Sequence, residues 1–525
     1  MELPHISSTT IALPAIFALL FFLYALFTIF SAHRKRLPPQ PRGAWPVIGH
    51  LPLLSGKEPH HTALGKLADV YGPIFMLRLG AHRTLIVSGW EVARECLTVN
   101  DKAFASRPKF AAAQLLGYDY AMFALSPYGS HWSHLRKIAT LELLANHRLE
   151  KLQHIPRSEV QISIEKLHQF CKSNNGGNKA LMEMETWFGE MALNTIFRMV
   201  VGKRFTTAFE GSGGAEYRHA LEDFFNLFTA FVPSDLFAFL KWFDFGGHKK
   251  AMKKTAKVLD KMLDKWLAEH RERRNSGEVT PEEQDFMHVM LSFIDNEEFP
   301  GYDADTVIKS TCLALILGGF HTTTTEMTWA LSLLLNREEA YEKVQEELDE
   351  HVGRDRVVKE SDLKILIYLQ AVVKETLRMY PAAQLSVPHE STEDCTIAGY
   401  HIPAKTRLWV NLYKLQRDPS VWENPDQFCP ERFLTTQKNF DVKGQNPQLI
   451  PFGAGRRICP AMIFALQVLH LSFARLLHEF EIRRPSEEPL DMEETAALNI
   501  TKKVPLRVIL TPRLSYEVCE FSSRV

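Results

Sequence analysis

The feature that most constrains this chain of 525 residues is the segment Pro451–Ala461, which reads Pro-Phe-Gly-Ala-Gly-Arg-Arg-Ile-Cys-Pro-Ala. Its two glycines allow backbone angles and close approaches that a side chain would block, and they lead to one cysteine, Cys459. Pro460 follows, a residue favoured at the first position of a helix, and apolar residues then recur from Ile463 to Phe473. The pattern therefore predicts a helix that begins at Pro460 and has Cys459 as its N-cap.

A cysteine at such a position has a specific chemistry. A helix N-terminus lowers the pKa of a thiol, and a thiolate presented on a glycine-tight loop is what an axial haem ligand requires. In the same segment, Phe452 is expected to shield the sulfur and Arg457 to reach a haem propionate. The alternative for an isolated cysteine is a small buried hydrophobic residue.

The segment resembles the cytochrome P450 superfamily, whose Phe-x-x-Gly-x-Arg-x-Cys-x-Gly loop is matched here by Phe452, Gly455, Arg457 and Cys459. Ala461 departs from that pattern, because the family usually has glycine there. The resemblance implies a mainly α fold with small β-sheets. It also implies haem b (iron protoporphyrin IX) as the cofactor, with Cys459 as the axial ligand of its iron.

A second feature is the proline-free, largely apolar stretch 305–336, which predicts one helix about 48 Å long. The run Gly318–Thr323 lies in its middle and opens with two adjacent glycines. Such glycines cost roughly 1 kcal/mol each against alanine. This weak point is explained if the helix passes close to a flat cofactor and opens a groove beside it. Leu315, two turns before Thr322, is expected to face the same space.

The same run predicts the catalytic residues. It is similar to the family's Ala/Gly-Gly-x-Asp/Glu-Thr-Thr motif, which implies that Thr322 offers a hydroxyl to bound dioxygen and organises water for proton delivery. His321 occupies the position of the usual acid. An imidazole can also relay protons, with a pKa near neutrality, so His321 and Thr322 are both predicted to be catalytic. The alternative is a packed helix whose threonines bond back to the preceding turn.

Two further constellations stand at helical spacing. Trp132 and Arg136 lie four apart, so an indole N–H and a guanidinium on one face can both bond a carboxylate. In the family the matching pair holds the haem propionates. Glu375 and Arg378 lie three apart and can pair. A downstream segment resembles the family's Pro-Glu-Arg-Phe, which implies that its Arg432 joins them in a buried triad with a structural role.

The N-terminal part predicts a membrane anchor. Residues 11–30 carry no charge, and about 20 apolar residues can cross about 30 Å of hydrocarbon. Lys and Arg follow this stretch and none precedes it, which leaves the rest of the chain in the cytosol. A cleaved signal peptide is the alternative. We expect an anchor over residues 1–32 (helix about 11–30), a basic, proline-rich hinge over 33–50 and a haem-thiolate catalytic domain over 51–525.

Composition excludes other classes of protein. Lys and Arg number 61 against 62 Asp and Glu, so no global charge favours nucleic acid. Seven scattered cysteines do not resemble a disulfide framework and fit a reducing compartment. Local patterns predict strands at 74–79 and 84–87, helices at 91–98, 131–137 and 363–380, and connecting loops at 173–179, 210–214 and 271–281.

The resemblance implies a monooxygenase reaction. Two electrons from NADPH arrive through an NADPH–cytochrome P450 reductase, one atom of O2 enters the substrate, and the other leaves as water. A basic face around Arg136, Lys137 and Arg456 is expected to dock the reductase. The implied location is the endoplasmic reticulum membrane, with a single anchor and a cytosolic catalytic domain.

The substrate is the least constrained expectation. The aromatic stretch 221–245 predicts either ordinary core or a pocket roof that dips into the bilayer interface. By the family layout, the pocket is expected to be lined by Leu115, Phe123, Phe228, Leu315, Phe320, Val387 and Ile500. These residues are apolar or aromatic, which favours a flat, lipophilic substrate.

The hinge, Ser126–Gly129 and Leu510–Leu514 together resemble enzymes of plant specialised metabolism. This resemblance favours a flavone that is hydroxylated on its A ring. A terpenoid or an alkaloid is the alternative substrate. The alternative activities are an oxygen-independent haem enzyme that rearranges a hydroperoxide and a haem-binding sensor without turnover.

Overall fold

The computed structural model describes residues 36–173, 179–205, 214–277, 284–294, 299, 301–495, 501–514 and 518. This part of the chain is mainly helical and carries small β-sheets, as predicted. The expected membrane anchor lies outside the described residues. Within the described ranges, no helix combines the length and the apolar character that crossing a membrane requires.

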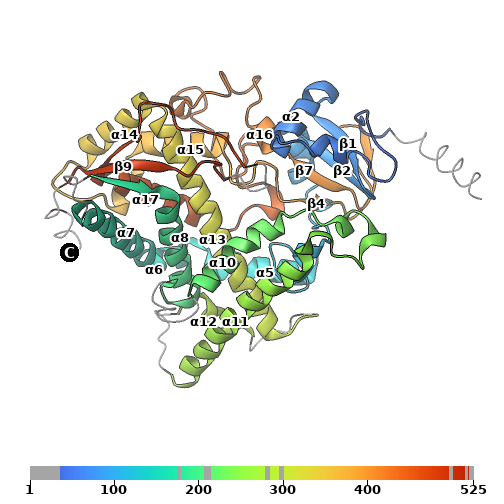
Figure 1. Cartoon of the computed structure of the whole chain (residues 1–525), viewed down its shortest axis with the longest axis horizontal. Coiled ribbons are helices and arrows are strands. Elements are labelled where there is room, and N and C mark those ends of the chain that lie inside the picture. The colour runs from blue at the N-terminus through green and yellow to red at the C-terminus, as the bar shows by residue number, and fades with distance from the viewer. Residues whose placement is uncertain are drawn as a thin grey trace, which may run out of the picture.

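The helices form most of the molecule (Figure 1). They are α2 (His60–Tyr71), α3 (Trp90–Arg94), α4 (Ala111–Leu115), α5 (Ser130–Ile138), α6 (Asn146–Leu152), α7 (His154–Ser173), α8 (Met184–Val201), α10 (Gly214–Phe228), α11 (His248–Asn275), α12 (Phe286–Ile294), α13 (Ala304–Leu335), α14 (Glu338–His351), α15 (Ile367–Met379), α16 (Leu412–Leu415) and α17 (Met462–Glu479).

Three small sheets complete the described fold. The strands are β1 (Ile74–Leu79), β2 (His82–Val87), β3 (Ala180–Glu183), β4 (His389–Glu390), β5 (Cys395–Ile397), β6 (Tyr400–Ile402), β7 (Arg407–Val410), β8 (Phe480–Arg483) and β9 (Arg507–Pro512). Their sheet orders are β1-β2-β7-β4, β3-β9-β8 and β5-β6. In the four-stranded sheet β2 pairs parallel with β7, whereas its other two pairings are antiparallel.

Helix α13 runs through the centre of the molecule (Figure 1). It begins at an N-cap, Asp303, whose side chain accepts a hydrogen bond from the Thr306 N–H at 2.9 Å. Most of its residues are buried, and it carries apolar side chains on all of its faces because it packs against α8, α11, α12, α15 and α17. A helix buried on nearly all sides is a rigid support for a site in its middle.

Several predicted boundaries need correction. The helix predicted over 363–380 is a 3₁₀ turn at Glu360–Lys364 followed by α15. The helix predicted over 91–98 is α3 followed by one wide turn, Glu95–Val99. Helix α11 continues to Asn275, so the loop predicted from residue 271 begins later than expected.

Candidate active site

Cys459 lies at the end of a loop that turns back on itself. Its backbone N–H donates to the carbonyl oxygen of Phe452 at 2.9 Å. Gly453 and Gly455 have φ values of 75° and 65°, a region that favours glycine. A Cβ on Gly455 would lie 1.9 Å from the carbonyl oxygen of Leu97, so no larger residue fits. The loop fixes the backbone of Cys459 while its side chain stays partly exposed.

The helix after this loop begins later than predicted. Helix α17 starts at Met462 and has Ala461 as its N-cap, so Cys459 is not the N-cap and Pro460 precedes the helix. Ala461 has a φ of −93°, which any L residue adopts. Its methyl group therefore causes no backbone strain where the family pattern has glycine.

The electrostatic prediction for Cys459 is also corrected. Burial raises the pKa of the thiol, against the smaller opposing effects of the Ala461 N–H and Arg136. The surroundings of Cys459 therefore favour the neutral thiol. A bound metal ion would supply the positive charge that favours the thiolate.

A cluster of cationic side chains adjoins the cysteine loop. Burial lowers the pKa of Arg107 to about 10. Burial is also the main cause that lowers the pKa of Arg457 to about 8, and the nearby charges of Arg107 and Arg136 lower it further. Trp132 packs against this cluster, and the guanidinium of Arg457 lies 4.2 Å from the centroid of the Trp132 ring. Burial and the neighbouring Arg107 lower the pKa of His389. Within the described part of the chain, no carboxylate pairs with these three arginines.

Positive charge buried without a counter-charge is costly, so the cluster fits an anionic ligand. The two propionates of a haem supply that charge next to a cysteine that needs a metal cation. The observed donor set therefore fits the predicted cofactor. Trp132, Arg136 and Arg457 were expected near the propionates from the sequence, whereas Arg107 and His389 were missed.

The two missed residues come from segments far apart in the chain. Arg107 follows the Ala103–Ala105 segment, and its guanidinium donates to the carbonyl oxygens of Val387 and Pro388, both at 2.8 Å. His389 comes next in that second segment, and its Nδ1 lies 2.8 Å from the carbonyl oxygen of Phe104. Neither residue stands in a local motif, so only the tertiary fold brings them to the cluster.

Replacing Arg136 with methionine is expected to make the haem dissociate roughly 10- to 100-fold faster, because a hydrogen bond to a charged group is worth about 1.5–3 kcal/mol. Arg136 is a clean test, since no hydrogen bond or ion pair within the described ranges depends on its side chain. The rate of haem transfer to an apo-haem acceptor protein measures the effect. Lys137→Met, which removes an exposed neighbouring charge, is the control, and equal rates in the two variants would contradict the assignment.

The second part of the candidate site is the middle of α13, which carries the predicted catalytic residues. Gly318 has no atom within 4 Å of where a Cβ would stand, and Thr322, one turn on, is exposed although most of the helix is buried. Thr322 Oγ1 donates to the Gly318 carbonyl oxygen at 2.6 Å, which is the back-bonded arrangement. Gly319 has a different role, because a Cβ there would lie 2.8 Å from the side chain of Ile196 in α8. Only one of the two glycines opens space.

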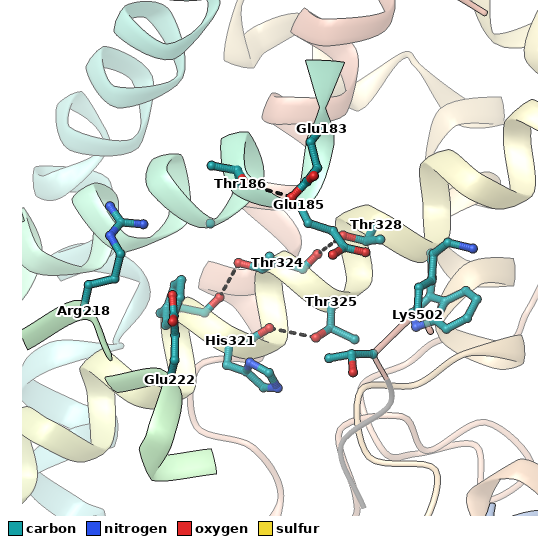
Figure 2. Close-up of a pocket in the computed structure, with 14 residues that line it drawn as sticks. Glu183, Glu185, Thr186, Arg218, Glu222, His321, Thr324, Thr325, Thr328 and Lys502 are labelled. Atoms are coloured by element: carbon teal, nitrogen blue, oxygen red, sulfur yellow. Dashed lines mark hydrogen bonds between the residues drawn. The ribbon is translucent and has the colours of Figure 1, made fainter. Parts of the chain in front are cut away.

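His321 does not have the predicted electrostatics. Burial lowers the pKa of its imidazole to about 4, so the ring is neutral at physiological pH and the expected pKa near neutrality is wrong. The ring stacks on Phe225 of α10, with centroids 4.1 Å apart and an interplanar angle of 20°. It lines a cavity of about 440 Å³ between α8, α10 and α13 (Figure 2). Thr325 at this cavity donates to the carbonyl oxygen of His321 at 3.0 Å.

Glu375, Arg378 and Arg432 lie together in the core. Glu375 and Arg378 are fully buried and Arg432 is 5% exposed. The Arg378 Nε donates to Glu375 Oε2 at 2.7 Å, and the Arg432 Nε donates to Oε1 at 3.1 Å. The Cys429 N–H also donates to Glu375 Oε1, at 2.9 Å. The Glu375 carboxylate thus links α15 to the segment that carries Arg432. That segment leads along the chain toward the cysteine loop.

The predicted pocket residues have mixed positions. Phe123 and Leu315 are buried, and Val387 is 40% exposed. Phe320 is buried against Gly189 of α8 and lines the cavity of Figure 2, so it does not share the face of Thr322. The half-buried positions are Leu115 and Phe228. Ile500 lies outside the described residues.

The aromatic stretch 221–245 contains both buried and exposed side chains. Phe224 is buried in α10, whereas Trp242 is 92% exposed.

The predicted basic face is not free at Arg456. Arg456 pairs with Asp101 at 2.9 Å and donates to Tyr128 Oη at 2.8 Å. Arg456 is therefore engaged within the chain.

Comparisons with known proteins show which family this chain resembles. The family model described as Cytochrome P450 matches residues 38–509. A strychnine-10-hydroxylase of Strychnos nux-vomica is 48% identical over 98% of this chain and 99% of its own length. A xanthotoxin 5-hydroxylase of Arabidopsis thaliana is 47% identical over 95% and 97%. A flavonoid-6-hydroxylase of Ocimum basilicum is 50% identical over 91% of each chain. A zebrafish cytochrome P450 solved with abiraterone has a TM-score of 0.71 at 28% identity, over 87% of this chain and all of the other.

Proposed function

The chain belongs to the cytochrome P450 family and is a monooxygenase of that family, and on this premise we propose that it hydroxylates a flavone on the A ring. Cys459 is the proposed axial ligand of the haem iron. The observation that carries the assignment is a partly exposed cysteine on a glycine-tight loop beside buried arginines without a counter-charge. The electrons come from NADPH through a reductase.

Different residues of this chain have different roles in the proposed reaction. The haem supplies the oxygen-activating chemistry when it is bound. Arg107, Arg136 and Arg457 neutralise its propionates, and the cysteine loop holds the sulfur in a fixed position. Thr322 presents an exposed hydroxyl on the α13 face that Gly318 leaves open. This hydroxyl orders water and passes protons, since a threonine hydroxyl is both a donor and an acceptor. It does not itself store a proton.

Two observations support an aromatic substrate. One relative is a flavonoid-6-hydroxylase by name. On this chain, Phe123 and Leu315 are buried apolar residues, and Phe228 packs edge-on against Phe110 with ring centroids 5.4 Å apart. Apolar and aromatic walls favour a flat, lipophilic molecule. An alkaloid is the second candidate substrate, favoured by the strychnine hydroxylase relative.

We also propose that the protein works at the endoplasmic reticulum membrane, with residues 1–32 as anchor, 33–50 as hinge and 51–525 as the cytosolic catalytic domain. Large exposed apolar side chains support this location. They are Trp45, Phe231, Phe239, Trp242, Phe243 and Phe245. Exposed side chains of this kind favour contact with a bilayer interface.

The test uses microsomes that contain the protein and an NADPH–cytochrome P450 reductase. We expect flavones to shift the haem toward the high-spin spectrum, to stimulate NADPH consumption and to yield an A-ring hydroxylated product. We also expect the protein to stay with the membranes after a high-salt wash. Product from alkaloids alone would transfer the assignment to the second candidate. Product formed only with added peroxide would contradict the reductase-dependent reaction.

A further inference from the structure

Helix α13 carries a buried acid that the sequence motifs do not include. Glu326 is 6% exposed, and its Oε1 accepts a hydrogen bond from the Ala382 N–H at 2.6 Å. Its other carboxyl oxygen, Oε2, is buried and has no hydrogen-bond partner among the described residues. A buried polar atom without a partner in a folded protein requires an explanation.

The carboxyl group of Glu326 holds a proton at neutral pH. Burial raises its pKa to about 8, and the Ala382 N–H only partly opposes this effect. Because Oε1 accepts from that N–H, the proton is expected on Oε2, where no described acceptor meets it. Glu326 is therefore a neutral acid with a free O–H to donate.

The position of Glu326 on the helix relates it to the site. It stands one turn after Thr322 and three turns after Leu315, so these three residues share one face of α13. The same face includes Gly318, where the helix borders open space. Ala382 follows α15, and α13 is braced there by Trp329, which stacks on Tyr380 with centroids 4.2 Å apart. Glu326 thus sits at a rigid junction beside the open face.

The reaction requires a group that can hold a proton and donate it, and no other group on α13 meets this requirement. Hydroxylation with dioxygen (R–H + O2 + 2 electrons + 2 protons giving R–OH + water) consumes two protons each turnover. His321 stands where an acid was expected, but its ring is neutral and stacks on Phe225. Helix α13 has only one other acid, Asp305 in its first turn.

We propose that Glu326 is the proton-holding residue of this site, donating from Oε2 through water to the Thr322 hydroxyl in the role that an acid at position 321 would have. The inference rests on the proposed monooxygenase function and deepens it. After donation the carboxylate regains a proton from water. The alternative role is purely structural, as a brace between α13 and the backbone after α15.

Glu326→Gln separates the two roles. The amide oxygen of glutamine still accepts from Ala382, so the brace remains, but the side chain can no longer release a proton. We expect an unchanged haem content and an unchanged reduced carbon monoxide spectrum. Product formation is expected to fall roughly 10- to 100-fold, with NADPH oxidation diverted to hydrogen peroxide and with a larger solvent isotope effect. Glu185→Gln, which alters a half-buried carboxyl of the neighbouring cavity, is the matched control.

A second measurement does not depend on turnover. The infrared spectrum of the haem-loaded wild-type protein at neutral pH should contain a protonated-carboxyl band that shifts in heavy water and is absent from Glu326→Gln. Lack of that band would overturn the proposal, and so would wild-type coupling in Glu326→Gln combined with haem loss in Glu326→Leu, which identifies a brace. A missing carbon monoxide band in the wild type would instead refute the haem-thiolate function itself.

Discussion

Replacing Cys459 with alanine is expected to abolish turnover and the red-shifted Soret band of the reduced carbon monoxide complex. The sulfur is the ligand atom that the cysteine loop presents, and the loop holds it by the Cys459 N–H bond to Phe452. Removing the sulfur leaves the iron without the thiolate donation that favours O–O cleavage. Absorption spectra and NADPH-dependent product formation measure the two effects.

Cys395→Ser is the matched control for that variant. Cys395 is also partly buried, and burial raises the pKa of its thiol to about 11, but it belongs to β5 and not to the cysteine loop. This variant should keep the Soret band and the activity. Activity that survived in Cys459→Ala would contradict the assigned ligand.

The second large effect concerns stability. Glu375→Ala is expected to lower the free energy of unfolding by about 3–5 kcal/mol, because it leaves two buried guanidinium groups without their carboxylate. This is a large part of the roughly 5–15 kcal/mol that stabilises a typical domain. The variant should therefore yield little haem-loaded protein, as measured by haem content per polypeptide and by the thermal midpoint.

A surface pair provides the comparison. Lys166 and Glu190 lie 2.6 Å apart, with side chains 47% and 31% exposed, and such pairs contribute about 0–1 kcal/mol. Glu190→Ala should therefore shift the thermal midpoint only slightly. Normal haem content in Glu375→Ala would remove the structural role from the buried triad.

Local patterns predicted the framework of the molecule well. Strand β1 has the predicted bounds, and α13 spans 304–335 against the expected 305–336. Both bounds follow from local signals, since α13 contains no proline and begins at the N-cap Asp303, and β1 ends directly before Gly80. The triad of Glu375, Arg378 and Arg432 was inferred from helical spacing and a resemblance, and the three side chains lie together as expected.

Properties that depend on tertiary burial could not be predicted in the same way. The pKa of His321 is set by its burial against Phe225, which no feature of the local sequence reveals. The adjacent glycines predict space for a cofactor, but Gly319 makes room for Ile196 of another helix. Arg107 and His389 reach the cationic cluster only through long-range contacts. Local sequence determines residue types and spacing, whereas charge states and long-range partners follow from packing.

The most direct measurement is the spectrum of the purified full chain, loaded with haem, reduced and exposed to carbon monoxide. A thiolate bond from Cys459 to the iron predicts a strongly red-shifted Soret band. A Soret band at the position typical of histidine-ligated or ligand-free haem would contradict the thiolate and the function built on it.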